Sequence, residues 1–240
     1  MPVKLIRYGI VGIWLIAAAV LSRPLFAATV VVDSTTDIFL ASQPDTTGVT
    51  GYFGTDTAPD NSPVLIAVTG GATLTFSASG SASVDDSCFA GPDGGCYPDE
   101  SGFSPAPASG TYKGPATALI GVFLDDNVTD VSNGPASLDY TDSANLNLLT
   151  NTPGLGQIFF IGDGLTDASL VQQFIAPTGA TRLFLAVADS IGASSGNEGS
   201  FTVDYTESVP EPASWALMIG GLGLAGAAMR RRAQRAALAI

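Results

Sequence analysis

The sequence predicts an all-β fold, an antiparallel β-sandwich, with a helical segment at each end of the chain. Three observations support this prediction. Between residues 29 and 208 helical periodicity is nearly absent, and short β-branched or aromatic runs recur instead. Gly, Pro, Asn, Asp and Ser separate these runs, and these residues favour turns. Long apolar stretches occur only near the two ends of the chain.

Residues 1–28 are predicted to be a secretory signal peptide with a helical apolar core. Lys4 and Arg7 precede an apolar stretch, residues 9–21, which is too short to span a bilayer comfortably. The small residues Ala27 and Ala28 provide a cleavage point. A retained N-terminal anchor is the alternative. The segment 29–208 is therefore expected to be an exported domain, which we call the ectodomain.

Eight runs in the ectodomain are predicted to be strands, and their spacing is typical of an antiparallel sandwich. Residues 73–76 and 201–205 alternate apolar and polar side chains, as half-buried strands do. The apolar runs 118–124 and 158–161 are expected to be central strands. Gly70 and Gly71 are expected to form a tight turn. The predicted strands are 29–32, 37–40, 64–68, 73–78, 118–124, 157–161, 181–187 and 200–205.

Two long loops rich in Gly, Pro and Asp, residues 84–115 and 125–156, are predicted between these strands. Cys88 and Cys96 lie in the first loop and are the two cysteines of the chain. In an exported protein two such cysteines are expected to form a disulfide. A two-cysteine metal site is the alternative, but the chain has no histidine or further cysteine to complete it.

Near the C-terminus a second apolar run, residues 213–229, is predicted to be a transmembrane helix. Its 17 residues would rise about 25 Å, which is short but sufficient to span a bilayer. Arg230, Arg231 and Arg232 would hold its end on the cytoplasmic side, with residues 233–240 as a short cytoplasmic tail. Residues 221–226 fit a dinucleotide-binding pattern. However, no strand precedes them, so we interpret their glycines as helix-packing residues.

Charge is distributed very unevenly along the chain. The ectodomain has two basic side chains, Lys113 and Arg182, against 21 acidic ones, which gives a net charge of −19. Such a surface repels phosphate backbones, so nucleic-acid binding is excluded, whereas divalent cations or cationic partners are favoured. The absence of histidine excludes Ser-His-Asp triads, Cys-His pairs and histidine zinc sites.

Pro210, Glu211 and Pro212 stand directly before the apolar run and the arginine cluster. In residues 209–232 this arrangement resembles the PEP-CTERM sorting signal of Gram-negative bacteria. The resemblance implies that the Pro-Glu-Pro motif is recognised by a membrane-embedded sorting protease, an exosortase. The helix would anchor the precursor in the inner membrane, and processing would then release the ectodomain or transfer it to the cell surface. An ordinary single-pass anchor is the alternative.

The segment after the predicted strand 181–187 contains several candidate oxygen ligands. Asp189 begins it, Asn197 follows eight residues later, and glycines and serines lie between them. Calcium binds six to eight oxygens from carboxylates, amides and backbone carbonyls. From the residues alone, a turn formed around an Asp at a strand end is the alternative.

The same segment resembles the calcium-dependent, galactose-binding bacterial lectins of the LecA (PA-IL) type. The resemblance rests on Asp189, Gly192, Asn197, Gly199, Ser200, Phe201 and Val203, with weaker matches at 73–83, 118–122 and 157–161. It implies a calcium ion held by the side chains of Asp189 and Asn197 and by the backbone carbonyls of Val84 and Ala193. Gly196 stands where the family has a second Asn ligand, and the sugar-contacting His and Gln have no counterpart.

Two other acidic segments are weaker candidates. Residues 125–130 have the oxygen density of a calcium loop, but Asp130 stands where an EF-hand needs glycine. Residues 161–167 read as the end of a strand followed by a turn. Two carboxylates can form a glycosidase pair, but no spacing singles one out among 21 acids.

Together these observations predict a non-enzymatic, exported protein of the cell surface or extracellular matrix. Its lectin-like sandwich would bind extracellular polysaccharide with the help of calcium. The alternative is a structural exopolysaccharide-matrix or biofilm protein with no specific sugar site. A hydrolase that acts on exopolysaccharide is a third hypothesis.

Overall fold

The structure is a computed structural model that describes most of the ectodomain and part of the C-terminal segment. The described residues are 25–85, 88–96, 112–126, 136, 138–209, 219–227 and 229–230. The predicted signal core, the motif Pro210, Glu211 and Pro212, Arg231, Arg232 and the tail 233–240 lie outside them. Of the predicted transmembrane helix, residues 219–227 and 229 are described and helical. Within the described part of the chain, no helix is long and apolar enough to cross a membrane.

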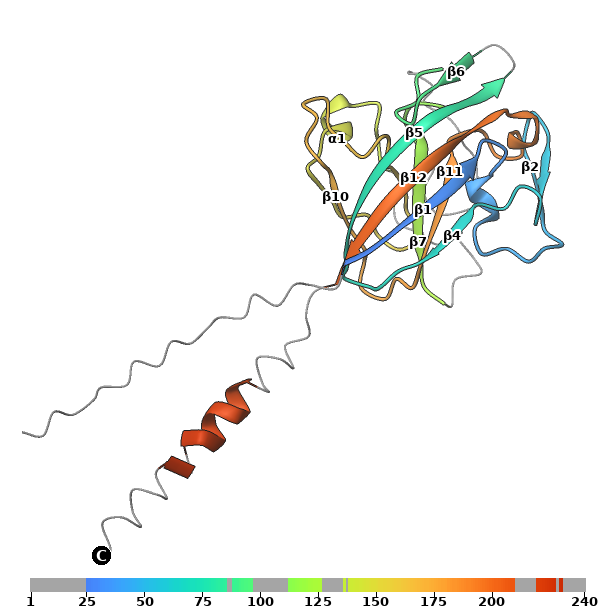
Figure 1. Ribbon diagram of the computed structural model, residues 1–240. Helices are drawn as coiled ribbons and strands as arrows, with labels where there is room; N and C mark the ends of the chain where they lie inside the picture. Colours follow the sequence, from blue (N-terminus) through green and yellow to red (C-terminus); the bar gives the residue numbers. More distant parts are fainter. Residues whose placement is uncertain are drawn as a thin grey trace, which may run out of the picture.

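Two sheets form the body of the ectodomain (Figure 1). The larger sheet has the strand order β1 (Leu25–Asp33), β12 (Gly199–Ser208), β5 (Thr73–Asp85), β10 (Gln173–Ile175) and β8 (Thr150–Asn151), with β6 (Cys88–Ala90) also paired to β5. The smaller sheet has the order β4 (Val64–Ala67), β11 (Arg182–Val187), β7 (Leu119–Leu124) and β9 (Ile158–Phe160). A separate hairpin pairs β2 (Gly48–Thr50) with β3 (Thr55–Thr57). The short helices are η1 (Ile38–Leu40), α1 (Ser143–Leu146) and η3 (Ser194–Gly196).

One apolar core lies between the two sheets. Phe174 of the larger sheet contacts Phe159 of the smaller sheet, with ring centroids 5.7 Å apart, and it also contacts Phe76 at 5.2 Å. Leu183 and Phe201, from opposite sheets, are completely buried in the same core. The β-rich fold class is therefore confirmed, and two sheets that share a core have the arrangement of the predicted sandwich.

Strands β1 and β12 pair along their whole shared length and bring the two ends of the ectodomain together. Leu25 lies opposite Ser208, and Asp33 lies opposite Ser200 at the other end of the ladder. We call the Leu25–Ser208 end basal and the Asp33–Gly199 end distal. In Figure 1 the distal end is the one that carries β2 and β6. Residues 25–28 of the predicted signal segment belong to β1, so cleavage after Ala28 would leave five of the nine residue pairs.

Seven of the eight predicted strands are confirmed, although their bounds differ by a few residues. The predicted strand 37–40 is wrong, because Ile38–Leu40 form the 3₁₀ helix η1. The side chain of Asp37 caps this helix by accepting a hydrogen bond from the Phe39 N–H at 2.8 Å. A short apolar run that is buried on all sides has no periodicity that distinguishes a strand from a helical turn.

Strand β5 extends seven residues beyond its predicted end at residue 78. The extension is rich in Ser and Gly, which have low strand propensity, but β12 pairs with it as far as Ala82 and β6 pairs with its end. Gly80 is required there, since its φ is +120° and a Cβ would lie 2.4 Å from the Ser200 carbonyl oxygen. The predicted turn at Gly70 and Gly71 is present, but it connects β4 in one sheet to β5 in the other.

The core contacts of Phe174 predict a large loss of stability when its ring is removed. Phe174→Ala should lower the free energy of unfolding by about 3–5 kcal/mol, because the substitution leaves a cavity between the sheets. Phe89→Ala is the matched control, since Phe89 is 52% exposed. Chemical denaturation of both variants measures the difference. Equal stability of the two variants would contradict the placement of Phe174 in the core.

Candidate functional site

The segment from Asp189 to Gly199, which we call loop 189–199, lies at the distal end and connects β11 to β12. It brings two of the predicted calcium ligands together. The Asn197 side-chain amide donates a hydrogen bond to Asp189 Oδ2 at 2.8 Å and another to the Ser34 carbonyl at 3.2 Å. The two side chains therefore lie in direct contact across the loop.

Of the other two predicted ligands, Ala193 lies within this loop and Val84 lies on a strand that borders it. Val84 is in β5, and Ala193 immediately precedes η3. The Ser83 N–H donates to the Glu198 carbonyl at 2.8 Å, and this bond ties the end of β5 to the loop. Asn197 turns its amide nitrogen toward Asp189, whereas a calcium ligand would present its oxygen. Among the residues that the structure describes, no group of three or more Asp, Glu or Cys is arranged to hold a metal. The calcium ligand set therefore stays a prediction.

Two buried aspartates, Asp37 and Asp56, hold loop 189–199 in place, and we call them the acid pair. Asp37 is 2% exposed and Asp56 is completely buried. Asp37 Oδ2 accepts the Gly192 N–H at 2.9 Å. The two oxygens of Asp56 accept the Ser194 and Ser195 N–H groups at 2.7 and 2.9 Å. Carboxylates that accept backbone N–H groups in this way replace the water that a free loop would bind.

The acid pair places two carboxyl groups next to each other in a buried environment. Burial is the main reason why the pKa of Asp37 rises to about 7, and the neighbouring Asp56 carboxylate adds to the increase. The hydrogen bonds from Gly192 and Phe39 act in the opposite direction. Near neutral pH, Asp37 is therefore close to its own midpoint of ionisation.

The β2–β3 hairpin packs its backbone directly on loop 189–199. A Cβ on Gly51 would lie 1.7 Å from the Ile191 carbonyl oxygen, and a Cβ on Gly54 would lie 2.7 Å from that of Gly192. Only glycine permits this approach at both positions. Between these two glycines, Tyr52 and Phe53 form the tip of the hairpin and project into solvent, with 94% and 74% of their surface exposed.

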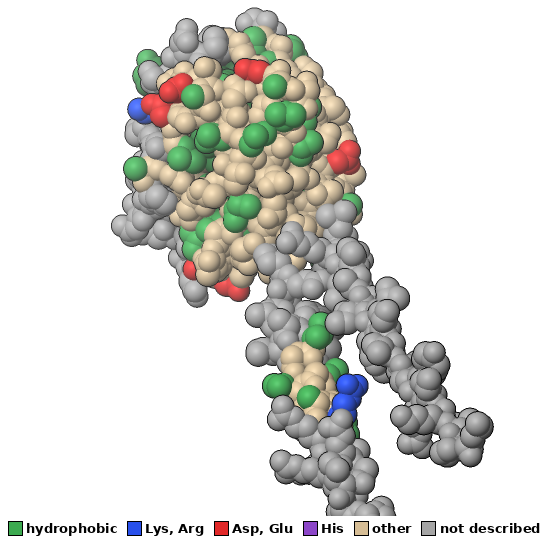
Figure 2. All heavy atoms as spheres, turned by 90° about the vertical axis from the view of Figure 1, so that its left-hand side faces the viewer, with side chains coloured by type: hydrophobic (Ala, Val, Ile, Leu, Met, Phe, Trp, Pro, Cys, Tyr) green, Lys and Arg blue, Asp and Glu red, His purple; other side chains and the backbone are tan. Residues whose placement is uncertain are grey.

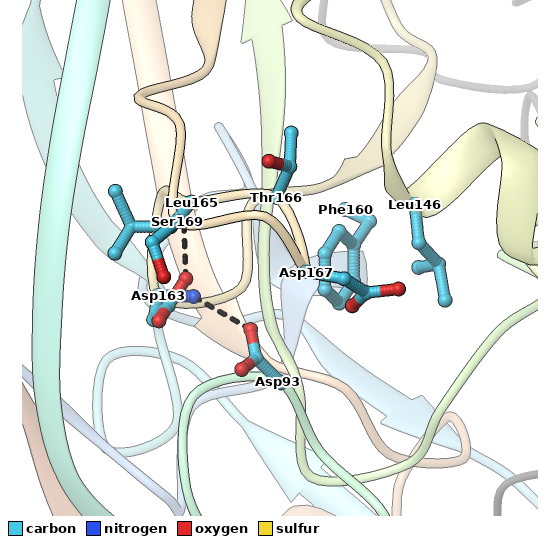
Figure 3. A pocket seen from close by; sticks show the side chains of 8 residues that line it. All are labelled: Asp93, Leu146, Phe160, Asp163, Leu165, Thr166, Asp167 and Ser169. Atoms are coloured by element: carbon cyan, nitrogen blue, oxygen red, sulfur yellow. Dashed lines mark hydrogen bonds between the residues drawn. The ribbon is translucent and has the colours of Figure 1, made fainter.

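A polar pocket of about 290 Å³ opens beside the turn after β9 (Figure 3). Its lining includes three carboxylates, from Asp93, Asp163 and Asp167. Asp93 accepts a hydrogen bond from the Asp163 N–H at 2.9 Å, and Asp163 accepts one from the Leu165 N–H at 2.7 Å. Burial, followed by repulsion from Asp163 and Asp167, raises the pKa of Asp93. The pocket is therefore rich in hydrogen-bond acceptors.

The disulfide between Cys88 and Cys96 closes the loop that carries Asp93. The Cα atoms of the two cysteines are 5.6 Å apart. Within the loop, the Pro92 carbonyl accepts the Leu119 N–H at 2.8 Å, which fixes the loop to β7. The disulfide therefore helps to place a carboxylate in the pocket, a consequence that the spacing of the cysteines alone did not indicate.

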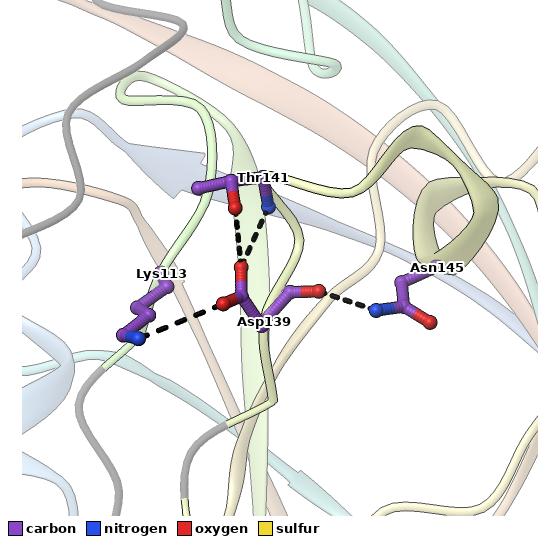
Figure 4. Close-up of polar contacts among 4 residues, drawn as sticks. All are labelled: Lys113, Asp139, Thr141 and Asn145. Atoms are coloured by element: carbon purple, nitrogen blue, oxygen red, sulfur yellow. Dashed lines mark hydrogen bonds and ion pairs between the residues drawn. The ribbon is translucent and has the colours of Figure 1, made fainter.

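Both basic side chains of the ectodomain make structural contacts. Lys113 pairs with Asp139 at 3.6 Å, and Thr141 and Asn145 complete this cluster (Figure 4). Thr141 hydrogen bonds, and then Lys113, lower the pKa of Asp139. Arg182 donates to Ser42 Oγ at 2.7 Å and to the Asp125 carbonyl, and its guanidinium lies over Phe184. Both basic side chains therefore take part in contacts within the ectodomain.

The described surface has little clustered charge on the face that Figure 2 presents. Acidic side chains appear there in small, separate groups, and uncharged polar groups and backbone form most of the surface between them.

Sequence reasoning identified loop 189–199 but missed the acid pair, the hairpin tip and the pocket. Asp37 was assigned to the predicted strand 37–40 and Asp56 to no element, and their partners lie more than 130 residues away along the chain. The turn 161–167 was read as structural, and the structure shows that it lines a pocket. The dipeptide Tyr52–Phe53 between two glycines was the one local signal that could have drawn attention to the tip.

A comparison with protein families identifies the C-terminal segment. Residues 208–232 match the PEP-CTERM protein-sorting motif. No curated protein matches the chain. The motif marks the chain as an exported surface protein that is anchored in the membrane before an exosortase processes it. The match begins at Ser208, the last residue of β12.

The raised pKa of Asp37 predicts a specific pH dependence of stability. The folded protein keeps a proton that the unfolded chain releases at its ordinary pKa of 3.8, so this group stabilises the fold most at low pH. That stabilisation should be lost as the pH rises from about 4 to about 7. In Asp37→Asn the loss should be absent, and thermal melts of both proteins across this range measure the difference. Asp45→Asn, at an exposed carboxylate, is the control, and a wild-type-minus-Asp37→Asn difference that does not vary with pH would contradict the assignment.

Proposed function

We propose that this protein binds extracellular polysaccharide at the distal end of its sandwich, while its basal end faces the membrane until processing. The observation that carries this proposal is the antiparallel pairing of β1 with β12. It places Leu25 beside Ser208, where the sorting motif begins, and directs loop 189–199 away from both. A strand rises about 3.3 Å per residue, so a nine-residue strand separates the two ends by about 27 Å.

The chemistry of the distal half supports a hydroxyl-rich ligand. The pocket beside Asp93 offers carboxylate and hydroxyl acceptors, which suit sugar hydroxyl groups as donors. The turn that forms it hydrogen-bonds to Leu119, at the end of β7 that pairs with Val187, and loop 189–199 follows Val187. Pocket and loop therefore belong to the same end of the smaller sheet. We include calcium at Asp189 and Asn197 in the proposal as an aid to binding, and we propose no catalytic role.

The sorting part of this account predicts the behaviour of a single variant. Glu211→Ala should block exosortase processing, because it removes the charged residue of the matched motif. A slightly larger, membrane-bound form should then accumulate, and fractionation followed by blotting detects it. Glu198→Ala, at an exposed glutamate outside the matched segment, is the control. If Glu211→Ala is released as the wild type is, the motif acts only as an anchor.

The binding part predicts retention on uncharged polysaccharide. The full chain in detergent should bind immobilised glucan or galactan more strongly in calcium than in magnesium, since a flexible site with many oxygens prefers the larger ion. Asp189→Asn should remove the difference between the two ions, whereas Asp204→Asn, at an exposed position on β12, should keep it. Pull-down assays measure both effects. If the chain is retained on no polysaccharide, the alternative of a matrix protein without a specific sugar site is favoured. If Asp189→Asn keeps the calcium effect, the loop is not the ion site.

A further inference from the structure

Two large aromatic side chains stand almost fully in solvent at the tip of the β2–β3 hairpin. Tyr52 is 94% exposed and Phe53 is 74% exposed, and their rings contact each other with centroids 5.0 Å apart. An exposed aromatic pair loses the free energy that burial would provide. Patches of this kind mark sites where a partner binds. We call Tyr52 and Phe53 the aromatic tip.

The backbone under the aromatic tip is fixed from several sides. The Gly51 N–H donates to the Gly54 carbonyl at 2.9 Å and closes the turn. Gly51 and Gly54 pack on loop 189–199, which the acid pair holds by three backbone N–H groups. Asp56 of the acid pair is itself a residue of β3, so the loop and the hairpin are fastened to each other. An aromatic anchor on a fixed backbone loses little conformational freedom when it binds.

We propose that the aromatic tip is the principal sugar-contacting site of the protein and that it binds the apolar face of a pyranose ring in an uncharged polysaccharide. This inference rests on the proposed function and specifies both the site and the class of ligand. The C–H face of a pyranose packs against an aromatic ring, and the tyrosine hydroxyl can also hydrogen-bond to a sugar hydroxyl. The hydroxyls of Thr50 and Thr55, 2.9 Å apart and exposed beside the tip, add further polar partners.

Three other occupants fit the observations less well. A bilayer is disfavoured, because the tip rests on loop 189–199 at the distal end and the sorting motif begins at the basal end. A second copy is disfavoured by area, since two aromatic side chains bury about 150–250 Å² each, whereas a stable interface needs about 800 Å² per partner. An anionic polymer is disfavoured by the net charge of −19 on the ectodomain. Its two basic side chains, Lys113 and Arg182, already contact Asp139 and Ser42.

The relative orientation of the two rings indicates which form of polysaccharide the aromatic tip would bind. The planes of the two rings stand at 85° to each other, so they do not form one flat platform. A flat crystalline polysaccharide requires coplanar rings, whereas a single sugar unit of a soluble chain can lie in the corner between perpendicular ones. The aromatic tip should therefore prefer soluble uncharged chains to crystalline fibres.

Affinity electrophoresis of the full chain in detergent tests this inference with dextran, galactomannan and mixed-linkage glucan as soluble uncharged probes. Alginate serves as the anionic probe and cellulose as the crystalline one. The double variant Tyr52→Ala/Phe53→Ala should bind the retained uncharged probe about tenfold more weakly or worse. Tyr52→Phe should keep most of the binding, and Phe89→Ala, at an exposed aromatic outside the tip, should bind as the wild type does. Thermal melts of each variant are the folding control, and a melting temperature equal to that of the wild type shows that the variant is folded.

The outcomes separate this inference from the proposed function. If the wild type binds an uncharged probe and the double variant binds it equally well, the aromatic tip is not the site, although the proposed function stands. If the wild type binds none of the probes, both proposals fail. Stronger binding to alginate or to cellulose than to the soluble uncharged probes overturns the ligand class. A double variant that loses only vesicle binding or self-association overturns the site in favour of a membrane or a second copy.

Discussion

The hydrogen-bonded ladder between β1 and β12 joins the first strand of the ectodomain to the last and determines which end of the domain carries both chain ends. Nine residue pairs hold the two strands antiparallel. The segment that precedes β1 and the segment that follows β12 must therefore leave the domain at the same end. Because both chain ends leave at the basal end, the distal end is free to contact molecules outside the cell. The sorting motif begins at the last residue of β12, so only the fold itself separates the membrane end from the distal loops.

At the distal end, buried polar side chains fix the backbone of loop 189–199. Apolar packing is the commoner way to hold a loop. Asp37 and Asp56 are buried carboxylates, and placing them side by side costs free energy. A proton on Asp37, whose pKa is raised to about 7, reduces this cost, and backbone N–H groups of loop 189–199 supply the hydrogen bonds. As a result, loop 189–199 and the β2–β3 hairpin are held in a fixed position relative to each other. Apolar packing alone would leave the polar backbone of this loop without partners.

Much of the sandwich could be predicted from the sequence, because its central strands are long apolar runs or clear alternations. Residues 119–124 and 182–187 form neighbouring strands of the smaller sheet, and their burial accounts for their continuous apolar runs. The site was less predictable. Asp37 was assigned to a strand because its apolar neighbours Ile38–Leu40 have no periodicity, and the partner that gives Asp37 its role lies at Gly192. The pocket depends on Asp93 meeting Asp163 across 70 residues, a contact that local patterns cannot encode. The sorting motif could be predicted because all its parts lie in one continuous segment of the chain.

The distance of the distal end from the bilayer can be measured in the membrane-anchored precursor. The membrane-anchored precursor can be placed in vesicles that contain an acceptor-labelled lipid, with a donor dye on a cysteine introduced at Phe53 or at Ser208. Energy transfer from Ser208→Cys should be strong, and transfer from Phe53→Cys should be much weaker, because the length of the β1–β12 ladder, about 27 Å, separates the two ends of the sandwich. Equal transfer from the two positions would mean that the sandwich lies on its side against the membrane, and the assignment of a membrane end and a binding end would then be wrong.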